Sequence, residues 1–219
     1  MNEEKVLTTQ SNQVTIVGEI VSDFKFSHEV FGEKFYEFNL SVKRFSGITD
    51  IIPCLVSERT ICIFKNTTLS HVKINGRFRS YNKVIDDKST LVLAVLVKDI
   101  ELVDESSINP VNKENNMIIL DSIIVKPPIL RKTPLGRKIA DVLVAVHRPY
   151  GNKSDYIPCI CWSEIAQYVS TLSVGDKLKI TGRIQSRQYV KTSPTGEMID
   201  KTAYEVSVYS IDLDTHDEN

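Results

Sequence analysis

The chain has 219 residues, of which 42% are hydrophobic and 25% are charged, and its formal net charge is −1. This composition is typical of a globular protein, and the length suffices for two domains of common size. No apolar run approaches the ~20 residues that a transmembrane helix requires, so we expect no membrane span. The first ten residues lack the basic and apolar regions of a secretory signal. Four cysteines in such a chain are typical of reduced thiols, so we expect a cytoplasmic location.

The first half of the chain is predicted to contain five strands and one helical segment. Alternating apolar residues, bounded by turn residues, predict strands at 13–26, 34–44, 50–57, 72–84 and 89–103. A helical segment is expected near 58–69, with a weak signal because its β-branched residues lower the helix propensity. Residues 106–115 contain Asn109-Pro110 and show no apolar periodicity, which is typical of a linker.

The second half is predicted to have the same order of elements. Its apolar pattern predicts strands at 117–125, 138–148, 155–162, 177–190 and 202–213. Ser163 is the predicted N-cap of a helix that carries Ile165, Val169 and Leu172 at helical spacing.

The two halves also share individual residues. Ile52-Pro53-Cys54 returns as Ile157-Pro158-Cys159, and Gly76-Arg77 returns as Gly182-Arg183. The order is kept while the spacing grows in single steps, as small loop insertions would produce. We therefore predict two copies of one domain, at residues 1–105 and 116–214, joined by the linker 106–115 and followed by a short acidic C-terminus at 215–219.

The predicted order in each copy is β-β-β-α-β-β. Five strands with one short helix after the third are the plan of an OB-fold, a five-stranded Greek-key barrel. The predicted fold class is therefore all-β, with two tandem OB-folds.

Charge is distributed unevenly between the two copies. Residues 1–110 carry 13 Lys+Arg and 15 Asp+Glu, a net charge of −2. Residues 116–211 carry 13 Lys+Arg and 8 Asp+Glu, a net charge of +5. A polyanion is therefore expected to prefer the second copy.

Several motifs of the second copy form a set. They are Gly136-Arg137-Lys138, the run from Asp155 to Trp162, and the run from Val174 to Tyr189, which contains Gly182-Arg183. This set resembles the bacterial single-stranded DNA-binding protein family, and the first copy matches mainly through its relation to the second. Some family members carry two OB domains per chain and dimerise to present four. The resemblance implies a non-enzymatic homodimer in the bacterial cytoplasm, associated with the nucleoid, that binds single-stranded DNA in replication, recombination or repair.

The resemblance also implies where bases would stack. Family members place aromatic residues at the end of the second strand, at two points on the third strand, and on the fourth strand. In the second copy these places hold Tyr150, Tyr156, Trp162 and Tyr189. Tyr156 and Trp162 are six residues apart, so a strand places them on the same face.

Lysine and arginine residues are interleaved with these aromatic residues, as contact with a charged backbone requires. In the second copy the predicted phosphate contacts are Arg131, Lys132, Lys138, Arg148, Lys153, Arg183, Arg187, Lys191 and Lys201. The first copy has no aromatic residue at three of the four places, so a weaker site or a dimer contact is expected there. Its candidate stacking residues are Phe45 and Tyr81, and its candidate phosphate contacts are Lys43, Arg44, Arg77, Arg79 and Lys83.

No other chemistry is indicated by the motifs. Cys159 and Cys161 lack the paired spacing of a zinc site, and we interpret them as buried thiols, so no metal and no cofactor are expected. The sequence has no Walker loop, dinucleotide turn or nucleophile elbow, so no enzyme is predicted.

Two alternatives stay open. One is an accessory OB protein of the primosome type, acting in replication restart mainly through protein contacts, and the other is an RNA-binding OB protein. The segment Asp212–Asn219 is acidic but has no apolar tip, so tail-mediated recruitment of replication proteins is not expected.

Overall fold

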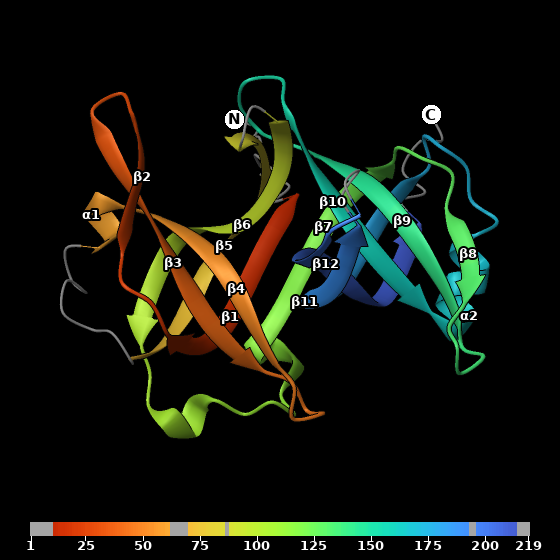
Figure 1. Ribbon diagram of the computed structural model, residues 1–219, viewed down its shortest axis with the longest axis horizontal. Helices are drawn as coiled ribbons and strands as arrows, with labels where there is room; N and C mark the ends of the chain where they lie inside the picture. The colour runs from red at the N-terminus through yellow and green to blue at the C-terminus, as the bar shows by residue number, and fades with distance from the viewer. Residues whose placement is uncertain (1–10, 62–69, 86–87, 193–195, 214–219) are drawn as a thin grey trace, which may run out of the picture.

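The computed structural model describes residues 11–61, 70–85, 88–192 and 196–213, and within them twelve strands form one continuous sheet (Figure 1). The first repeat supplies β1 (Asn12–Ile20), β2 (Lys25–Val30), β3 (Glu33–Lys43), β4 (Thr49–Ser57), β5 (His71–Ile85) and β6 (Lys88–Leu102). The second repeat supplies β7 (Asn116–Ile124), β8 (Ile129–Lys132), β9 (Lys138–His147), β10 (Ser154–Trp162), β11 (Lys177–Thr192) and β12 (Met198–Leu213). The α-helices are α1 (Glu58–Ile61) and α2 (Ser163–Val169), and short 3-10 turns lie at Glu105–Ser107 and Lys113–Asn115.

Each half of the sheet closes into a barrel. In the first repeat the strands follow the order β3-β4-β6-β5-β1, and β1 pairs back with β3. In the second repeat the order is β9-β10-β12-β11-β7, and β7 pairs back with β9. The β4–β6 and β10–β12 pairs are parallel. Five strands closed in this way, with a short helix after the third, confirm the predicted tandem OB-folds.

Three local predictions differ from the structure. The strand predicted at 13–26 is broken after Ile20, and Lys25–Val30 forms a separate strand that pairs with β3. In the second repeat β8 is likewise an additional strand, paired with β9. Ser163 is not an N-cap: Trp162 holds that position without a side-chain hydrogen bond, and Ser163 has a φ of 54°. Of the helix predicted at 58–69, residues 62–69 lie outside the described residues.

The core follows from the alternation of apolar residues along the strands. On β1, Val14, Ile16 and Ile20 are buried, and on β7 their counterparts Ile118, Leu120 and Ile124 are also buried. Since burial of each such side chain contributes about 1.5–3 kcal/mol, the repeated pattern produces two similar cores.

A repeated glycine permits a close approach in each barrel. The β5–β6 register shifts at Asn75/Gly76, and the β11–β12 register shifts at Thr181/Gly182. A Cβ atom on Gly182 would lie 2.5 Å from the carbonyl oxygen of Ser207. Only glycine therefore fits these bulges, which explains why Gly-Arg recurs in the sequence.

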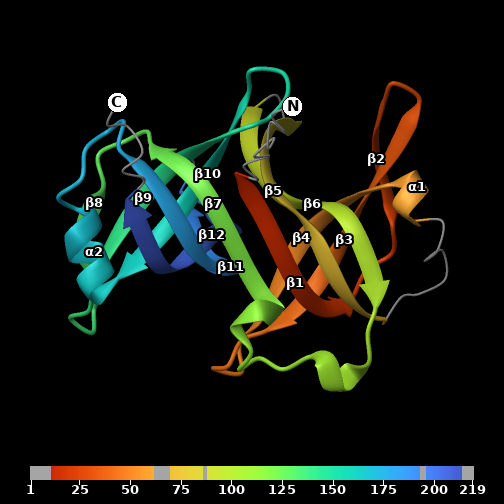
Figure 2. The same cartoon turned by 180° about the vertical axis from the view of Figure 1, so that it is seen from behind.

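The two barrels are joined edge to edge. Strands β1 and β7 pair in antiparallel fashion, from Asn12 opposite Leu120 to Ile16 opposite Asn116. Figure 2 shows these two strands side by side between the barrels. Because each strand also belongs to its own barrel, the backbone hydrogen bonds continue from one repeat to the other.

A buried carboxylate of each repeat accepts hydrogen bonds from the other repeat. Asp155 is fully buried and accepts hydrogen bonds from Arg148 (2.6 Å) and from Arg79 of the first repeat (2.6 Å). It also accepts from the backbone N–H of Ser80 (2.8 Å), while Arg148 donates to the Ser80 carbonyl oxygen (2.7 Å). We call these four residues the Asp155 clamp.

Arg44 and Asp50 of the first repeat form an equivalent Asp50 clamp with Ser186 of the second repeat. Asp50 is fully buried, and it accepts hydrogen bonds from Arg44 (2.7 Å) and from the backbone N–H of Ser186 (2.7 Å). Arg44 also donates to the carbonyl oxygen of Ser186 (2.8 Å). The Asp50 clamp joins the β3–β4 turn of the first barrel to β11 of the second, and the Asp155 clamp joins the β9–β10 turn of the second barrel to β5 of the first. Together they hold the repeats in one relative orientation.

Neither α1 nor α2 is long enough to cross a membrane, and no other helix in the described ranges is a candidate for a span.

Candidate nucleic-acid interface

Strand β11 carries a stripe of cationic and aromatic side chains. Its odd-numbered residues from Arg183 to Lys191 share one face, because side chains alternate along a strand. Tyr189 lies directly opposite Lys201 on β12. The guanidinium carbon of Arg187 lies 5.7 Å from the ring centre of Tyr189. One face of the β11–β12 arm therefore combines an aromatic ring with several positive charges.

Strand β10 presents its two predicted aromatic residues outward. Ile157, Cys159 and Cys161 are buried in the barrel, while Tyr156 is 47% exposed and Trp162 is half-buried. The two rings share a face, as predicted, but six residues of strand separate them by roughly 20 Å. They therefore belong to different parts of the surface.

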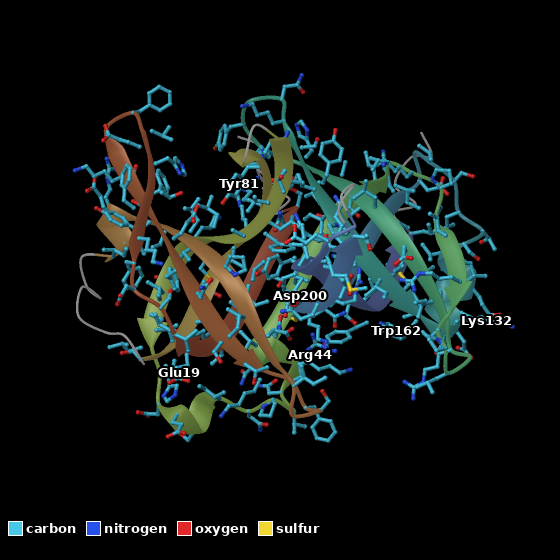
Figure 3. All side chains as sticks on the ribbon, viewed as in Figure 1. Glu19, Arg44, Tyr81, Lys132, Trp162 and Asp200 are labelled. Atoms are coloured by element: carbon cyan, nitrogen blue, oxygen red, sulfur yellow. The ribbon has the colours of Figure 1, made fainter. Side chains whose placement is uncertain are left out.

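Trp162 lies in an open groove with a volume of about 470 Å³, which we call the Trp162 groove. In Figure 3 the labels of Lys132, Trp162 and Arg44 follow one another across the second barrel toward the junction with the first. The groove is lined by Arg44, Arg131, Thr133, Ile139, Ile160, Trp162, Arg183, Gln185, Arg187 and Glu205. Four guanidinium groups and one indole thus face a common space, with a single carboxylate.

The charges in the Trp162 groove are only partly neutralised. Glu205 is buried, accepts a hydrogen bond from Gln185 (2.9 Å) and lies 3.5 Å from Arg187. The Nη2 atom of Arg183 donates to Gln185 over 3.3 Å, and its buried Nε has no partner among the described residues. A hydrogen bond to Asp141 raises the pKa of Arg131. Arg44 pairs with Asp50, so Arg183 is the arginine of the groove without a carboxylate partner among the described residues, and an anionic ligand would supply its counter-charge.

Tyr150 and Tyr156 each lie near residues of the first repeat. Tyr150 is 86% exposed in the turn between β9 and β10. The backbone N–H of Tyr156 donates to the Ser80 hydroxyl (2.7 Å) on β5 of the first repeat. Burial, together with Arg79, lowers the pKa of the Arg77 guanidinium, while Tyr150 acts in the opposite direction. Tyr150 therefore lies near Arg77, and Tyr156 near Ser80, of the first repeat.

Lys98 is a candidate contact that the sequence did not reveal. Partial desolvation by neighbouring atoms lowers the pKa of its ammonium group, and the charges of Arg77 and Arg79 lower this pKa further. Lys98 is exposed, and it lies at the register shift of the β5–β6 pair, between Val97 and Asp99. Its counterpart at the equivalent bulge of the second repeat is Tyr209, so the comparison of the two copies gave no sign of a basic residue there.

Three arginines that were predicted to contact phosphates are instead paired with buried carboxylates. Arg44, Arg79 and Arg148 are ion-paired to fully buried carboxylates, and their side chains are 15%, 16% and 27% exposed. Their bonds to Asp50 and Asp155 hold the repeats together, which argues against phosphate contact as their main role. Arg44 and Arg148 occupy equivalent positions in the two repeats because each of them forms part of a clamp.

Apart from Arg183, which is half-buried, the other predicted basic residues of the second repeat are exposed. Arg131 pairs with Asp141 at 2.9 Å, and both side chains are more than 40% exposed. Lys138 donates to Gln167 at 2.5 Å. All five predicted lysines of the second repeat are exposed, namely Lys132, Lys138, Lys153, Lys191 and Lys201.

The described residues of the first repeat differ from the second repeat at the place of Trp162. Ser57 replaces Trp162 and is hydrogen-bonded to Glu33. Tyr81 is half-buried, and its hydroxyl lies 3.4 Å from Glu37; burial and this carboxylate raise its pKa to about 12. Phe45 is 77% exposed. Lys43 is also exposed, while the side chain of Lys83 lies outside the described part of the structure.

The cysteines support the prediction of buried thiols. Cys54, Cys159 and Cys161 are buried and unpaired, and burial raises the pKa of Cys161 to about 12. Among the described residues, no group of three or more His, Cys, Asp or Glu side chains could hold a metal ion.

Comparison with known proteins agrees with this geometry. Residues 115–214 match the model of the single-strand binding protein family. Over 80 residues the chain is 35% identical to single-stranded DNA-binding protein 3 of Listeria innocua and to single-stranded DNA-binding protein A of Bacillus subtilis. The match covers 34% of this chain and 50% and 46% of those proteins, so it spans about half of their length.

The whole chain has a structural counterpart. The wild-type single-stranded DNA binding protein from Thermus aquaticus superposes with a TM-score of 0.74 at 18% identity, covering 95% of each chain. At this identity the likeness establishes the fold. The second repeat, which carries the Trp162 groove, is thus the part of the chain that matches the single-strand binding protein family in sequence.

Proposed function

We propose that the chain binds single-stranded DNA without sequence specificity, along the outer face of the second repeat. The observation that carries the proposal is the Trp162 groove, where an indole lies among four arginines beside Tyr189 of β11. Arg44, Arg131 and Arg187 each pair with a carboxylate, whereas Arg183 has no such partner among the described residues. Aromatic rings stack on bases at about 1–3 kcal/mol each with little regard to sequence. Arginine and lysine track the phosphates and release counterions.

The proposal explains a preference for single strands over duplex. Stacking requires a base face, which a duplex conceals between neighbouring base pairs. A protein that covers unpaired bases in this way would protect and organise single strands during replication, recombination or repair. The relatives named as single-stranded DNA-binding proteins support this role.

Equilibrium binding of a fluorescein-labelled oligo-dT, followed by anisotropy, tests the proposal. Tyr189→Ala is expected to weaken binding by roughly 5- to 100-fold, the equivalent of one lost stacking contact. The control is Arg59→Ala, which removes an 80% exposed side chain on α1 of the first repeat and should leave affinity within about twofold.

Three outcomes would contradict the proposal in different ways. Equal affinity for duplex of the same length would exclude stacking as the basis of binding. Tighter binding to a matched RNA oligomer would favour the RNA-binding alternative. No binding to any of these would favour an accessory protein-interaction module.

We also propose that two chains assemble into a homodimer with four OB-folds. Support comes from the outer face of β7, where Met117, Ile119 and Ile123 lie on the side opposite the barrel core, and Ile123 is 42% exposed. Light scattering should give twice the chain mass of 24.8 kDa, and Ile119→Glu should shift the particle toward a single chain. A single-chain mass at every concentration would contradict the dimer.

A further inference from the structure

A second groove lies between the linker and the junction of the repeats. It has a volume of about 290 Å³, and we call it the linker groove. Its lining contains four basic residues, namely Lys43, Arg44, Lys113 and Arg183, and none of its lining residues is a carboxylate. The charge of Arg44 is compensated by Asp50, so Lys43, Lys113 and Arg183 supply the positive charge of the groove. Its wall includes residues 108–113 and 115 of the linker, together with Asn116 at the start of β7. The connection therefore forms one side of a positively charged cleft.

Aromatic rings accompany these charges. Phe45 is 77% exposed at the turn between β3 and β4. Tyr209 is half-buried on β12, and the Lys113 ammonium lies 5.2 Å from the centre of its ring. The linker groove thus combines rings and cations in the same way as the Trp162 groove, although its residues come from both repeats and the linker.

Arg183 connects the two grooves. Its side chain lines both of them. Its Nη2 atom donates over 3.3 Å to the neutral side chain of Gln185, and among the described residues its guanidinium group has no carboxylate partner. A guanidinium group without a counter-charge is unfavourable when it is partly buried. An anion at the boundary between the grooves would supply that charge.

We propose that the linker groove continues the single-stranded DNA site, so that a strand leaving the Trp162 groove passes Arg183 and places a nucleotide between the linker and Phe45. In this arrangement the base lies against Phe45 and Tyr209, and Lys113 contacts a phosphate. The inference rests on the proposed function. It adds that the linker is part of the binding surface and that a bound strand crosses from the second repeat to the first.

Oligomer length separates this inference from the proposed function. An OB-fold covers roughly 4–16 nucleotides, so an oligo-dT of roughly 8 nucleotides fits the Trp162 groove and one of roughly 30 also reaches the linker groove. We expect Lys113→Ala and Phe45→Ala, made in the full chain, to weaken binding of the longer oligomer about three- to tenfold. The shorter oligomer should bind as before. Lys113→Ala should also lower the slope of log K against log salt by about 1 for the longer oligomer.

Lys179→Ala is the matched control. Lys179 is an exposed lysine on β11, but it lines a separate groove together with Asp121 and Asp212. It should leave the affinity for both oligomers unchanged. A second measurement, photo-crosslinking of a bromodeoxyuridine-substituted 30-mer, should label Phe45 or Tyr209.

The outcomes are distinguishable. Failure of the wild-type chain to bind either oligomer would overturn the proposed function and this inference together. Normal wild-type binding, with Lys113→Ala and Phe45→Ala unchanged on both lengths and no crosslink at Phe45 or Tyr209, would overturn the inference alone. Equal losses on the short and long oligomers would also overturn it, because the linker groove would then not be an extension of the site.

Discussion

The Asp155 clamp predicts a large difference between two carboxylates of similar chemistry. Asp155→Asn removes a charge that is fully buried and that pairs with Arg148 and Arg79. Asp141→Asn removes a charge that also pairs with an arginine, Arg131, but is 42% exposed. The two substitutions are isosteric, so they differ mainly in the burial of the ion pair.

The magnitude follows from the environment of each pair. Removing one partner of a buried ion pair typically costs about 3–5 kcal/mol, because the remaining charge stays uncompensated. Asparagine can still accept the hydrogen bond from the Ser80 N–H, so we expect the lower end, about 3 kcal/mol, for Asp155→Asn. For a chain of this length that corresponds to a decrease in Tm of roughly 6–12 °C. The exposed pair is worth at most about 1 kcal/mol.

Calorimetry and urea unfolding of the wild type and both variants provide the assay. Because the clamp joins the two repeats, Asp155→Asn should also separate their unfolding into two transitions or broaden the single one. Asp141→Asn should remain close to the wild type. If Asp155→Asn lost no more stability than Asp141→Asn, the argument that buried carboxylates hold the repeats together would be refuted.

Three further predictions follow from the structure. Gly182→Ala should destabilise the second barrel by about 1–3 kcal/mol in urea unfolding, since its Cβ would lie 2.5 Å from the Ser207 carbonyl oxygen; wild-type stability would contradict the bulge geometry. Arg187→Ala should weaken binding to oligo-dT and lower its salt slope by about 1, and an unchanged slope would remove Arg187 from the phosphate contacts. Cys161 should resist alkylation of the native protein at pH 8, because burial raises its thiol pKa to about 12; rapid modification, located by mass spectrometry, would contradict this.

The fold was predictable because its determinants are local and occur twice. Alternating apolar residues define the strands, and Gly76 and Gly182 mark the bulge in each barrel. The additional strands β2 and β8 were missed because their side chains are mostly exposed and show no apolar alternation. Their pairing depends on β3 and β9, which lie beside them only after the barrel has formed.

The candidate site was only partly predictable, for a physical reason. The sequence placed Tyr156 and Trp162 on one face, but they lie at opposite ends of β10, roughly 20 Å apart, and the elements beside each end are known only from the fold. Arg44 and Arg148 looked like phosphate contacts because they recur next to exposed aromatic residues. Their partners Asp50 and Asp155 also recur, but the serines that complete each clamp, Ser186 and Ser80, belong to the other repeat and lie far away in the sequence.

The central claim is that single-stranded DNA binds across the Trp162 groove, and Trp162 itself is the most direct probe because the chain has no other tryptophan. Its fluorescence should be followed during titration with oligo-dT and with duplex of equal length, at low and high salt. The account predicts strong quenching by the single strand alone, with an affinity that falls as salt rises. Unchanged fluorescence on saturation with oligo-dT would contradict the placement of DNA in this groove.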